Sequence, residues 1–313
     1  MGSADASRRP GRLGVGVVGA GRVGAVLGAA LRSAGHAVVG VSAVSEASRE
    51  RAENLLPGVP VLEVPDIIER AELVLLAVPD DALAPLVDGL AQLGVWQAGQ
   101  LVVHTSGRYG TAVLGPARAA GAIPLAIHPA MTFTGLSLDL GRLPDTAFGI
   151  TAPSAVLPIA QALVVEMGAE PVVIEEESRA LYHAALAHAS NHLVTIAAQS
   201  AQLLADLGVQ HPDRMLGPLM KASLENALSA GEGALTGPVA RGDAGTVRIH
   251  RAALEAHDAP DTRQAYLGMA RATALRALER GVLTPAQGES ILAALADDPG
   301  TGDPPGPGSD TGD

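Results

Sequence analysis

The sequence predicts an α/β fold: a doubly wound, mainly parallel sheet, followed by an all-helical domain. Over residues 13–174, short β-branched runs alternate with Ala- and Leu-rich stretches of helical periodicity, which is typical of such a sheet. After three consecutive glutamates at 175–177, long helical patterns take over. A chain of 313 residues has room for two domains, and we place their boundary near residue 175.

The expected elements follow in chain order. The strands are 14–18, 37–41, 73–78, 100–104, 123–127, 148–150 and 171–174. The later helices are 179–207, 212–230, 244–256, 261–280 and 285–296, with Gly208, Gly231 and Gly281 as stop signals. The first domain therefore covers 13–175 and the second 176–296. The polar, Gly- and Pro-rich ends, 1–12 and 297–313, are expected to be disordered because they bury little apolar surface.

Composition excludes several classes of protein. A formal charge of −12 argues against nucleic acid or an anionic membrane as partner. The absence of cysteine removes disulfides, thiolate metal sites and cysteine nucleophiles. We also find no signal peptide and no apolar run of the ~20 residues that a membrane span requires. We therefore expect a soluble, cytoplasmic protein.

Gly19, Gly21 and Gly24 form a G-x-G-x-x-G motif between the first expected strand and the first helix. In that context the motif indicates a dinucleotide site. The first glycine permits a tight turn, the second lets the backbone approach a pyrophosphate, and the third lets the helix pack on the strand. The helix start, at Arg22 and Val23, would present free N–H groups to the phosphates. A purely structural glycine turn is the alternative, because the chain has 37 glycines.

Ligands of open α/β sheets bind outside the carboxyl ends of the strands, so residues that follow strands are candidate site residues. Val78 and Pro79 follow one strand and could cross the cofactor, and Asp80 could cap the next helix. Turn chemistry alone also explains Pro79 and Asp80.

Two further strands each end at or just before a histidine. His104 leads into Thr105, Ser106 and Gly107, which gather several hydrogen-bonding groups in one loop, and His128 directly follows the next strand. We expect Thr105 to contact the cofactor, and Ser106 and His128 to line its nicotinamide end.

NADP is favoured over NAD. An NAD site usually places an acid at the end of the second strand to bind the ribose 2′-hydroxyl, but no acid occurs there before Glu46. Ser42, Ser45 and one of Arg49 and Arg51 could instead bind a 2′-phosphate. Alternatively, Ser45 caps a helix whose arginines are solvated.

With these residues in hand, the chain resembles the 6-phosphogluconate-dehydrogenase-like superfamily. More closely, it resembles a bacterial group of Rossmann-like NADP oxidoreductases whose C-terminal helical domain has no assigned function, and it is similar to ketopantoate reductases. The segments that carry the resemblance are 19–24, 76–80, 104–107, 126–129, 182–185, 189–194 and 235–243.

The resemblance implies a catalytic lysine one helical turn from an asparagine on the first long helix. The chain has one lysine, Lys221, and it is not on that helix. Another group must therefore donate the proton. We expect Asn191 to position the substrate oxygen, helped by His183 or a water, because both residues fall near one face of the helix. The alternative for His183 is a half-buried residue bound to backbone.

Two other features receive weaker assignments. His188 and His192 are spaced as a metal pair, but no third ligand is signalled nearby, so we expect no metal. In the loop at 235–243, Thr236 and Arg241 would bind a substrate carboxylate. The alternative is a rigid connection in which Arg241 pairs with Asp243.

We therefore expect an NADP-dependent oxidoreductase that reduces a small 2-oxo acid, with ketopantoate to pantoate, in pantothenate biosynthesis, as the specific candidate. The alternatives are an imine reductase of the pyrroline-5-carboxylate type and a non-catalytic NADP-binding regulatory protein. The expected partners are a small anionic substrate and a second copy of the chain in a homodimer. The expected cofactor contacts are Gly19, Gly21, Arg22, Val23, Gly24, Ser42, Val78, Pro79 and Thr105.

Overall fold

The computed structural model describes residues 12–296. The ends at 1–11 and 297–313, where we expect disorder, lie outside the described residues. The chain divides into two compact units, 1–192 and 193–313, each described here by itself. The division falls within the long helix α7 (Arg179–Asp206). The expected domain boundary near residue 175 stays a prediction.

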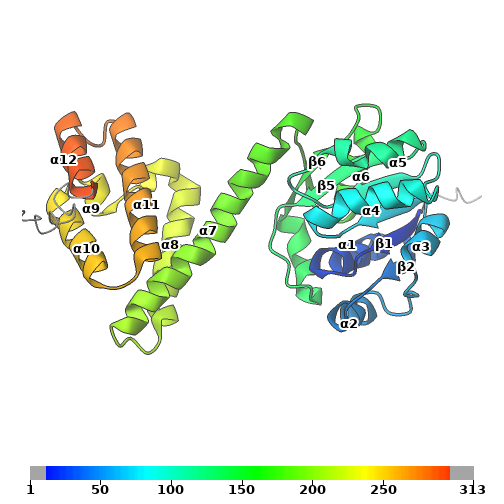
Figure 1. The fold of residues 1–313 in the computed structure, drawn as a ribbon, viewed down its shortest axis with the longest axis horizontal. Helices are drawn as coiled ribbons and strands as arrows, with labels where there is room; N and C mark the ends of the chain where they lie inside the picture. The colour runs from blue at the N-terminus through cyan, green and yellow to red at the C-terminus, as the bar shows by residue number, and fades with distance from the viewer. Residues whose placement is uncertain (1–11, 297–313) are drawn as a thin grey trace, which may run out of the picture. The chain divides into compact units, whose positions relative to one another are not determined.

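The first unit is built on a seven-stranded sheet (Figure 1). Its strand order is β2-β1-β3-β4-β5-β6-β7, so the order reverses at β1. Neighbouring strands are parallel except β5 and β6, which pair antiparallel. The strands are β1 (Gly14–Val18), β2 (Ala37–Ser42), β3 (Leu73–Leu76), β4 (Leu101–His104), β5 (Ile123–Pro129), β6 (Ala147–Thr151) and β7 (Glu170–Val173).

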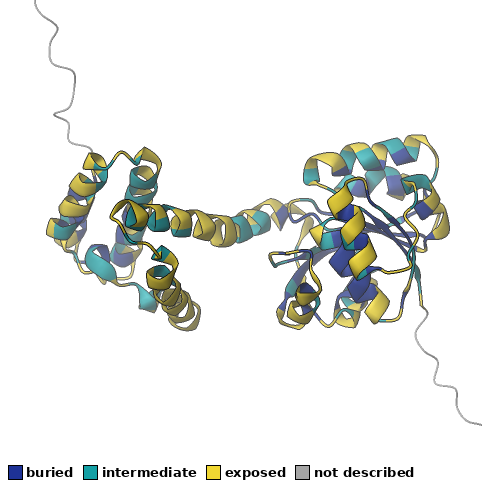
Figure 2. Ribbon diagram, turned by 90° about the horizontal axis from the view of Figure 1, so that it is seen from below, coloured by how far each residue is buried: buried dark blue, intermediate teal, exposed yellow. Residues whose placement is uncertain are grey.

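Helices cover both faces of this sheet, which confirms the doubly wound fold. On one face, α1 (Arg22–Ser33) and α6 (Leu157–Glu166) share an apolar core with alternate residues of the strands. On the other face, α3 (Val64–Arg70), α4 (Asp80–Gln92) and α5 (Gly115–Ala119) do the same. The central strands β3 and β4 are wholly buried (Figure 2), which explains why they read as continuous apolar runs, whereas the edge strands β2 and β7 are partly exposed.

The second unit is helical. It contains the second half of α7 together with α8 (Pro212–Ala230), α9 (Gly237–Ala240), α10 (Ala244–Ala256), α11 (Pro260–Glu279) and α12 (Pro285–Leu295). Small apolar residues such as Ala270, Ala274 and Ala294 form much of the core between α10, α11 and α12. Thr284 starts α12 with a capping box to Gln287. The small side chains let these helices pack closely, which a chain with 2% aromatic residues requires.

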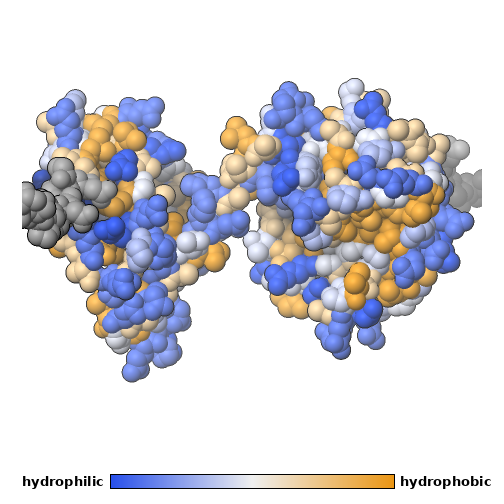
Figure 3. Space-filling model, in the orientation of Figure 1, coloured by the Kyte–Doolittle hydropathy of each residue, from blue (hydrophilic) through white to orange (hydrophobic). Residues whose placement is uncertain are grey.

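Helices α7 and α8 bury little of their own surface. Arg179 is the buried residue of α7, and α8 has no buried residue over its 19 positions. Exposed apolar side chains recur on α8, including Leu219, Leu224 and Leu228. Figure 3 shows hydrophobic residues interspersed with hydrophilic ones on the visible face of the second unit. No helix within 12–296 is long and apolar enough to cross a membrane.

The expected first and last residues of these strands and helices lie within two residues of those in the structure. Gly208, Gly231 and Gly281 follow helices with positive φ, as their role as stop signals requires. Two expectations need correction. Asp80 is the first residue of α4 rather than its cap, because Pro79 occupies the N-cap position. The loop expected at 235–243 contains a helical turn, α9.

Candidate functional site

Gly19 and Gly24 are required by the fold itself. Gly19 directly follows β1 with φ +98°, and a Cβ there would lie 2.6 Å from the carbonyl oxygen of Ala77. A Cβ on Gly24 would lie 2.0 Å from the carbonyl oxygen of Gly19 and 2.8 Å from the Cβ of Ala77. Both glycines thus permit the close approach of β1, α1 and the end of β3, at the point where the strand order reverses.

Gly21 has no such internal reason to be glycine. It is the N-cap residue of α1, with φ −72° and ψ −171°, a backbone conformation open to any residue. A Cβ at this position would meet nothing within 4 Å. No side chain caps the helix. The start of α1 is therefore a bare surface of backbone N–H groups, which suits a phosphate.

Ser42 and Arg51 reach this glycine loop from β2 and α2 (Glu46–Leu55). The Ser42 hydroxyl accepts a hydrogen bond from the Gly19 N–H at 2.9 Å. The Arg51 Nε donates to the Ala20 carbonyl oxygen at 3.3 Å. Arg51 is therefore the arginine that lies at the glycine loop, and it leaves the end of its guanidinium available for an anion.

Ser45 has a different task from Ser42. Its side chain accepts from the Ser48 N–H at the start of α2, so the helix-cap alternative is correct for this residue. Arg49, on the same helix, is exposed. The helix-cap interpretation therefore holds for Ser45, whereas Arg51 lies at the glycine loop, where the phosphate-binding interpretation requires an arginine.

The loop after β5 lies against Arg22 and Arg51, beside the glycine loop. A Cβ on Gly135, which has φ +80°, would come within 2.9 Å of Arg51 Cδ and 3.1 Å of Arg22 Cγ. The buried carboxylate of Asp139 holds this loop by accepting from the N–H groups of Thr134 and Gly135, both at 2.8 Å. The two arginines therefore lie against one ordered loop.

The other expected cofactor residues lie at the ends of β3 and β4. A Cβ on Gly19 would be 3.5 Å from Val78 Cγ1, so Val78 lies beside the glycine loop. Pro79 is exposed at the start of α4. The Thr105 N–H donates to the Leu76 carbonyl oxygen at 3.2 Å, and Thr105 is half-buried. Their contact with a cofactor stays a prediction.

A cluster of polar rings lies at the carboxyl end of β5. The Nδ1 of His128 is 2.9 Å from the Tyr182 hydroxyl, and the ring centroids of His128 and His183 are 6.1 Å apart. A Cβ on Gly107 would lie 2.6 Å from His183 Cδ2 and 2.9 Å from His128 Nε2. The loop after β4, the end of β5 and the first turns of α7 therefore meet here.

Burial determines the charge of these groups. Burial, the nearby guanidinium of Arg179 and His183 lower the pKa of His128 to about 4, so His128 is neutral near pH 7. Burial raises the pKa of the Tyr182 hydroxyl, which therefore keeps its proton. His128 thus acts as a hydrogen-bonding group and not as an acid at neutral pH.

Arg179 lies beneath this cluster with 1% of its surface exposed. Its guanidinium donates to the Thr151 hydroxyl at 2.7 Å and to the carbonyl oxygens of Ala126 and Gly149, both at 3.1 Å. Its Nη1 has no hydrogen-bond partner in the described structure. Arg179 joins β5, β6 and α7, and so fixes the helix that carries Tyr182 and His183.

His104 braces the loop that contains Ser106. Its Nε2 lies 2.8 Å from the Gly110 carbonyl oxygen, and its Nδ1 accepts from the Ser106 N–H at 3.2 Å. Burial lowers the pKa of His104 to about 4. The Ser106 side chain is itself buried and accepts from the Tyr109 N–H at 3.4 Å. His104 is therefore a structural residue, and Ser106 has a structural contact besides its expected role.

Asn191 lies apart from the ring cluster. It is exposed on α7, eight residues after His183. This spacing corresponds to about 12 Å along a helix. His188 and His192, beside it, contact each other through their Nδ1 atoms at 2.8 Å. The structure thus brings His128, His183 and Ser106 to one end of the sheet, and the role expected for Asn191 stays a prediction.

Thr236 and Arg241 belong to the second unit. Thr236 is the N-cap residue of α9 and lines a cavity of about 400 Å³. Arg241 follows α9, is exposed, and is not part of that lining. The Asp243 carboxylate caps α10 by accepting from the Thr246 N–H at 3.0 Å. The structure therefore places Thr236, but not Arg241, in the lining of this cavity, and their contact with a substrate stays a prediction.

Arg179, Tyr182, Gly107 and Gly135 were not assigned roles from the sequence. Arg179, Tyr182 and His183 are spaced i, i+3 and i+4, which places them on one face of α7. That spacing was visible in the sequence, but nothing there showed that the face meets the end of β5. The two glycines are explained only by side chains that approach them from distant segments.

Comparison with known families and structures agrees with this architecture. Residues 1–129 match the Rossmann-like domain, and residues 146–273 match a domain of unknown function, DUF2520. A comparison with curated proteins gave no match. The chain thus matches a Rossmann-like domain in its first part and DUF2520 in its second.

Three solved structures are similar over most of the chain. BF3122 of Bacteroides fragilis, whose name places it provisionally among NADP oxidoreductases, is 23% identical with a TM-score of 0.68, over 84% of this chain and 98% of its own. Protein TM1727 of Thermotoga maritima is 25% identical with a TM-score of 0.62, over the same shares. An imine reductase from a Pseudomonas species is 19% identical with a TM-score of 0.56, over 91% and 93%.

Proposed function

We propose that this protein is an NADP-dependent oxidoreductase that reduces a carbonyl or imine group of a small molecule. The observation that carries the proposal is Gly21, a glycine that the fold does not need, at the bare start of α1. Gly19 and Gly24, in contrast, have internal reasons. A pyrophosphate bound against the backbone would explain why residue 21 is a glycine. The names of BF3122 and of the Pseudomonas imine reductase support the same class of reaction.

The residues around the glycine loop fit the cofactor. Gly21, Arg22 and Val23 would hold the pyrophosphate at the start of α1. Ser42 orders the loop, and Arg51 would bind the 2′-phosphate that distinguishes NADP from NAD. A bound NADPH would supply the hydride, and the chain must supply the proton.

The ring cluster at the end of β5 would serve the reacting group. His128 is neutral and can donate a hydrogen bond from Nε2 when Tyr182 donates to its Nδ1. His183, whose ring lies beside that of His128, would donate the proton as the hydride arrives. Asn191, farther along α7, would orient the substrate through its amide.

The substrate candidates differ in the bond reduced. Ketopantoate, a 2-oxo acid, is the candidate that the sequence favours, with Thr236 and Arg241 as its expected contacts. Pyrroline-5-carboxylate, an imine, needs less stabilisation of a developing oxyanion and so tolerates the missing lysine better. A small anionic substrate is part of the same proposal. So is a homodimer, in which a second copy of the chain would cover the exposed faces of α7 and α8.

The first experiment follows the absorbance of NADPH with purified protein and each candidate in turn, with NADH in parallel. Oxidation at about 1 s⁻¹ or faster, with NADPH preferred, is the expected result for one of them. Tight binding of NADPH without turnover of ketopantoate, pyrroline-5-carboxylate or an uncharged ketone would instead support the non-catalytic regulatory alternative.

A matched pair of glycine variants tests the cofactor site itself. Gly21→Ala should weaken NADPH binding about tenfold or more, while the melting temperature stays unchanged, because the new Cβ meets only open space. Gly89→Ala, in α4, is the control: its Cβ also meets nothing within 4 Å. Equal NADPH affinity in Gly21→Ala and the unmodified protein would contradict the proposal.

A further inference from the structure

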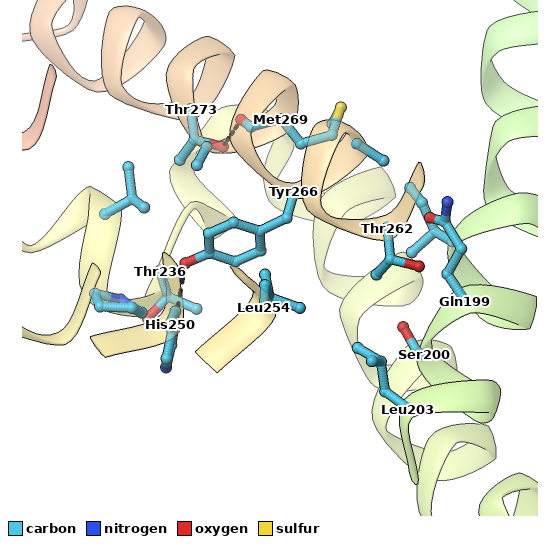
Figure 4. A pocket seen from close by; sticks show the side chains of 15 residues that line it. Gln199, Ser200, Leu203, Thr236, His250, Leu254, Thr262, Tyr266, Met269 and Thr273 are labelled. Carbon is cyan, nitrogen blue, oxygen red and sulfur yellow. Dashed lines mark hydrogen bonds between the residues drawn. The ribbon is translucent and has the colours of Figure 1, made fainter. Parts of the chain in front are cut away.

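The second unit contains a cavity of about 400 Å³, formed by α7, α9, α10 and α11 (Figure 4). Cavities of a few hundred Å³ are of the size that holds small molecules. Every residue that lines this one belongs to the second unit, so its shape does not depend on the first. Its lining includes Thr236, His250, Leu254, Ala265, Tyr266 and Met269.

The lining is apolar in the middle and polar at its ends. Leu254, Met269 and the ring of Tyr266 lie between two groups of polar side chains in Figure 4. One group is formed by Thr236, His250 and the Tyr266 hydroxyl, and Gln199 lies in the other. This arrangement suits a molecule with an apolar body and a polar head.

The polar head would meet a pair of linked side chains. The Nδ1 of His250 lies 2.9 Å from the Tyr266 hydroxyl, so one of the two donates to the other. If the imidazole donates, the hydroxyl proton of Tyr266 points to a ligand; if the hydroxyl donates, the imidazole offers its Nε2 proton. Burial raises the pKa of Tyr266, so its hydroxyl keeps that proton. Either arrangement offers a hydrogen-bond donor.

Charge decides the class of ligand. Among the described residues that line the cavity, none is Asp, Glu, Lys or Arg. Arg241, the residue expected to bind a carboxylate, is outside the lining. At a pH where His250 is neutral, an anion in this cavity would lose its hydration without gaining a cationic partner, which is costly. An uncharged acceptor, such as a ketone or imine, would lose little.

We propose that the cavity of the helical unit binds an uncharged ketone or imine with an aliphatic or aromatic body, whose oxygen or nitrogen accepts a hydrogen bond from the Tyr266–His250 pair. This is a binding site, and its test needs neither cofactor nor turnover. Its occupant is uncharged and therefore differs from the small anionic substrate of the proposed function.

The probes are two molecules that differ in charge but hardly in shape, cyclohexyl methyl ketone and cyclohexanecarboxylate. The readout is the methyl NMR signal of Met269, in protein carrying ¹³C-labelled methionine methyl groups. The chain has six methionines, and Met269→Leu identifies the signal that belongs to the cavity. We expect the ketone to shift this signal with a dissociation constant in the millimolar range, about what a ligand of nine heavy atoms attains. The carboxylate should bind at least tenfold more weakly.

Variants locate the site. Tyr266→Phe keeps the ring and should weaken ketone binding about 3- to 10-fold, as the loss of one hydrogen bond implies. Ala265→Phe fills the cavity and should abolish the shift, whereas Ala272→Phe, at an exposed position of the same helix outside the lining, should not change it.

Three results would overturn the proposal: no ketone-dependent shift of Met269, equal binding of ketone and carboxylate, or equal loss in the two alanine variants. The result is independent of the proposed function. Ketone binding without oxidation of NADPH by any of the substrate candidates would keep the site and count against the reductase; oxidation of NADPH without ketone binding here would keep the reductase and refute the site.

Discussion

The backbone of Gly107 lies directly against the imidazole of His128, so closely that an added Cβ would be 2.9 Å from the His128 Nε2. The same Cβ would lie 2.6 Å from the ring of His183. Gly107 lies in the loop after β4, His128 is the penultimate residue of β5, and His183 is on α7. A residue with no side chain therefore sets the space in which the two histidines of the candidate active site are placed.

This contact predicts the effect of Gly107→Ala. The new methyl group must displace both imidazoles, and a displacement of about 1 Å can cost on the order of 100-fold in turnover. We expect kcat to fall by about that factor while NADPH affinity changes less than about twofold, because the glycine loop is not touched. Steady-state kinetics and NADPH titration measure the two effects.

Gly115→Ala is the matched control, since a Cβ at the start of α5 would meet nothing within 4 Å. It should leave both kcat and NADPH affinity unchanged. Unchanged turnover in Gly107→Ala would remove His128 and His183 from the reaction.

The position of Arg51 predicts that its replacement weakens the binding of NADPH selectively. Its Nε is held at the Ala20 carbonyl oxygen, which places the guanidinium at the glycine loop. Arg51→Ala should raise the dissociation constant of NADPH about 10- to 100-fold, the effect of losing charge-assisted hydrogen bonds, and leave that of NADH nearly unchanged. Fluorescence titration with both nucleotides measures this difference.

Arg49→Ala removes the same charge from an exposed position on the same helix and is the control. We expect it to have little effect on either nucleotide. An equal loss of NADPH affinity in both variants would show that general charge, not the position of Arg51, matters.

The lowered pKa of His104 predicts how the free energy of unfolding depends on pH. Burial lowers its pKa from 6.5 to about 4 in the folded protein. Between these values the unfolded chain takes up a proton that the folded chain does not, so the free energy of unfolding falls as the pH falls. One such histidine contributes about 1.4 kcal/mol per pH unit to this slope. His128, with its similar shift, adds to it.

The measurement is urea unfolding followed through Trp96, the single tryptophan, which is buried in the first unit. His104→Gln preserves a donor and an acceptor but does not titrate. Its stability should therefore depend less steeply on pH between about 6.5 and 4 than that of the unmodified protein. Identical slopes would mean that His104 is not held neutral by the fold.

Much of the fold was predictable because it depends on local patterns. Apolar strand runs, helical periodicity and glycine stops are written within a few residues of each other. They determined the order and type of the elements and the doubly wound sheet. The G-x-G-x-x-G motif is local in the same sense, so Gly19 and Gly24 could be assigned their roles from the sequence, and the structure bears out their tight packing.

The candidate active site depended on contacts between distant segments. The sequence places His104 and His128 alike, each at the end of a strand. Tertiary structure separates them, because the ring of His104 turns into its own loop while that of His128 meets α7. Likewise, Thr236 and Arg241 are five residues apart, yet one lines a cavity and the other does not.

The sequence by itself therefore determined the elements, their order and the position of the glycine loop, since short-range sterics and hydrophobic periodicity decide these. Only the tertiary structure decided which side chains meet. The buried guanidinium of Arg179 donates to residues 28, 30 and 53 positions away in the chain, and such pairings leave no local pattern. They arise when packing removes water from both partners and each polar group must find another.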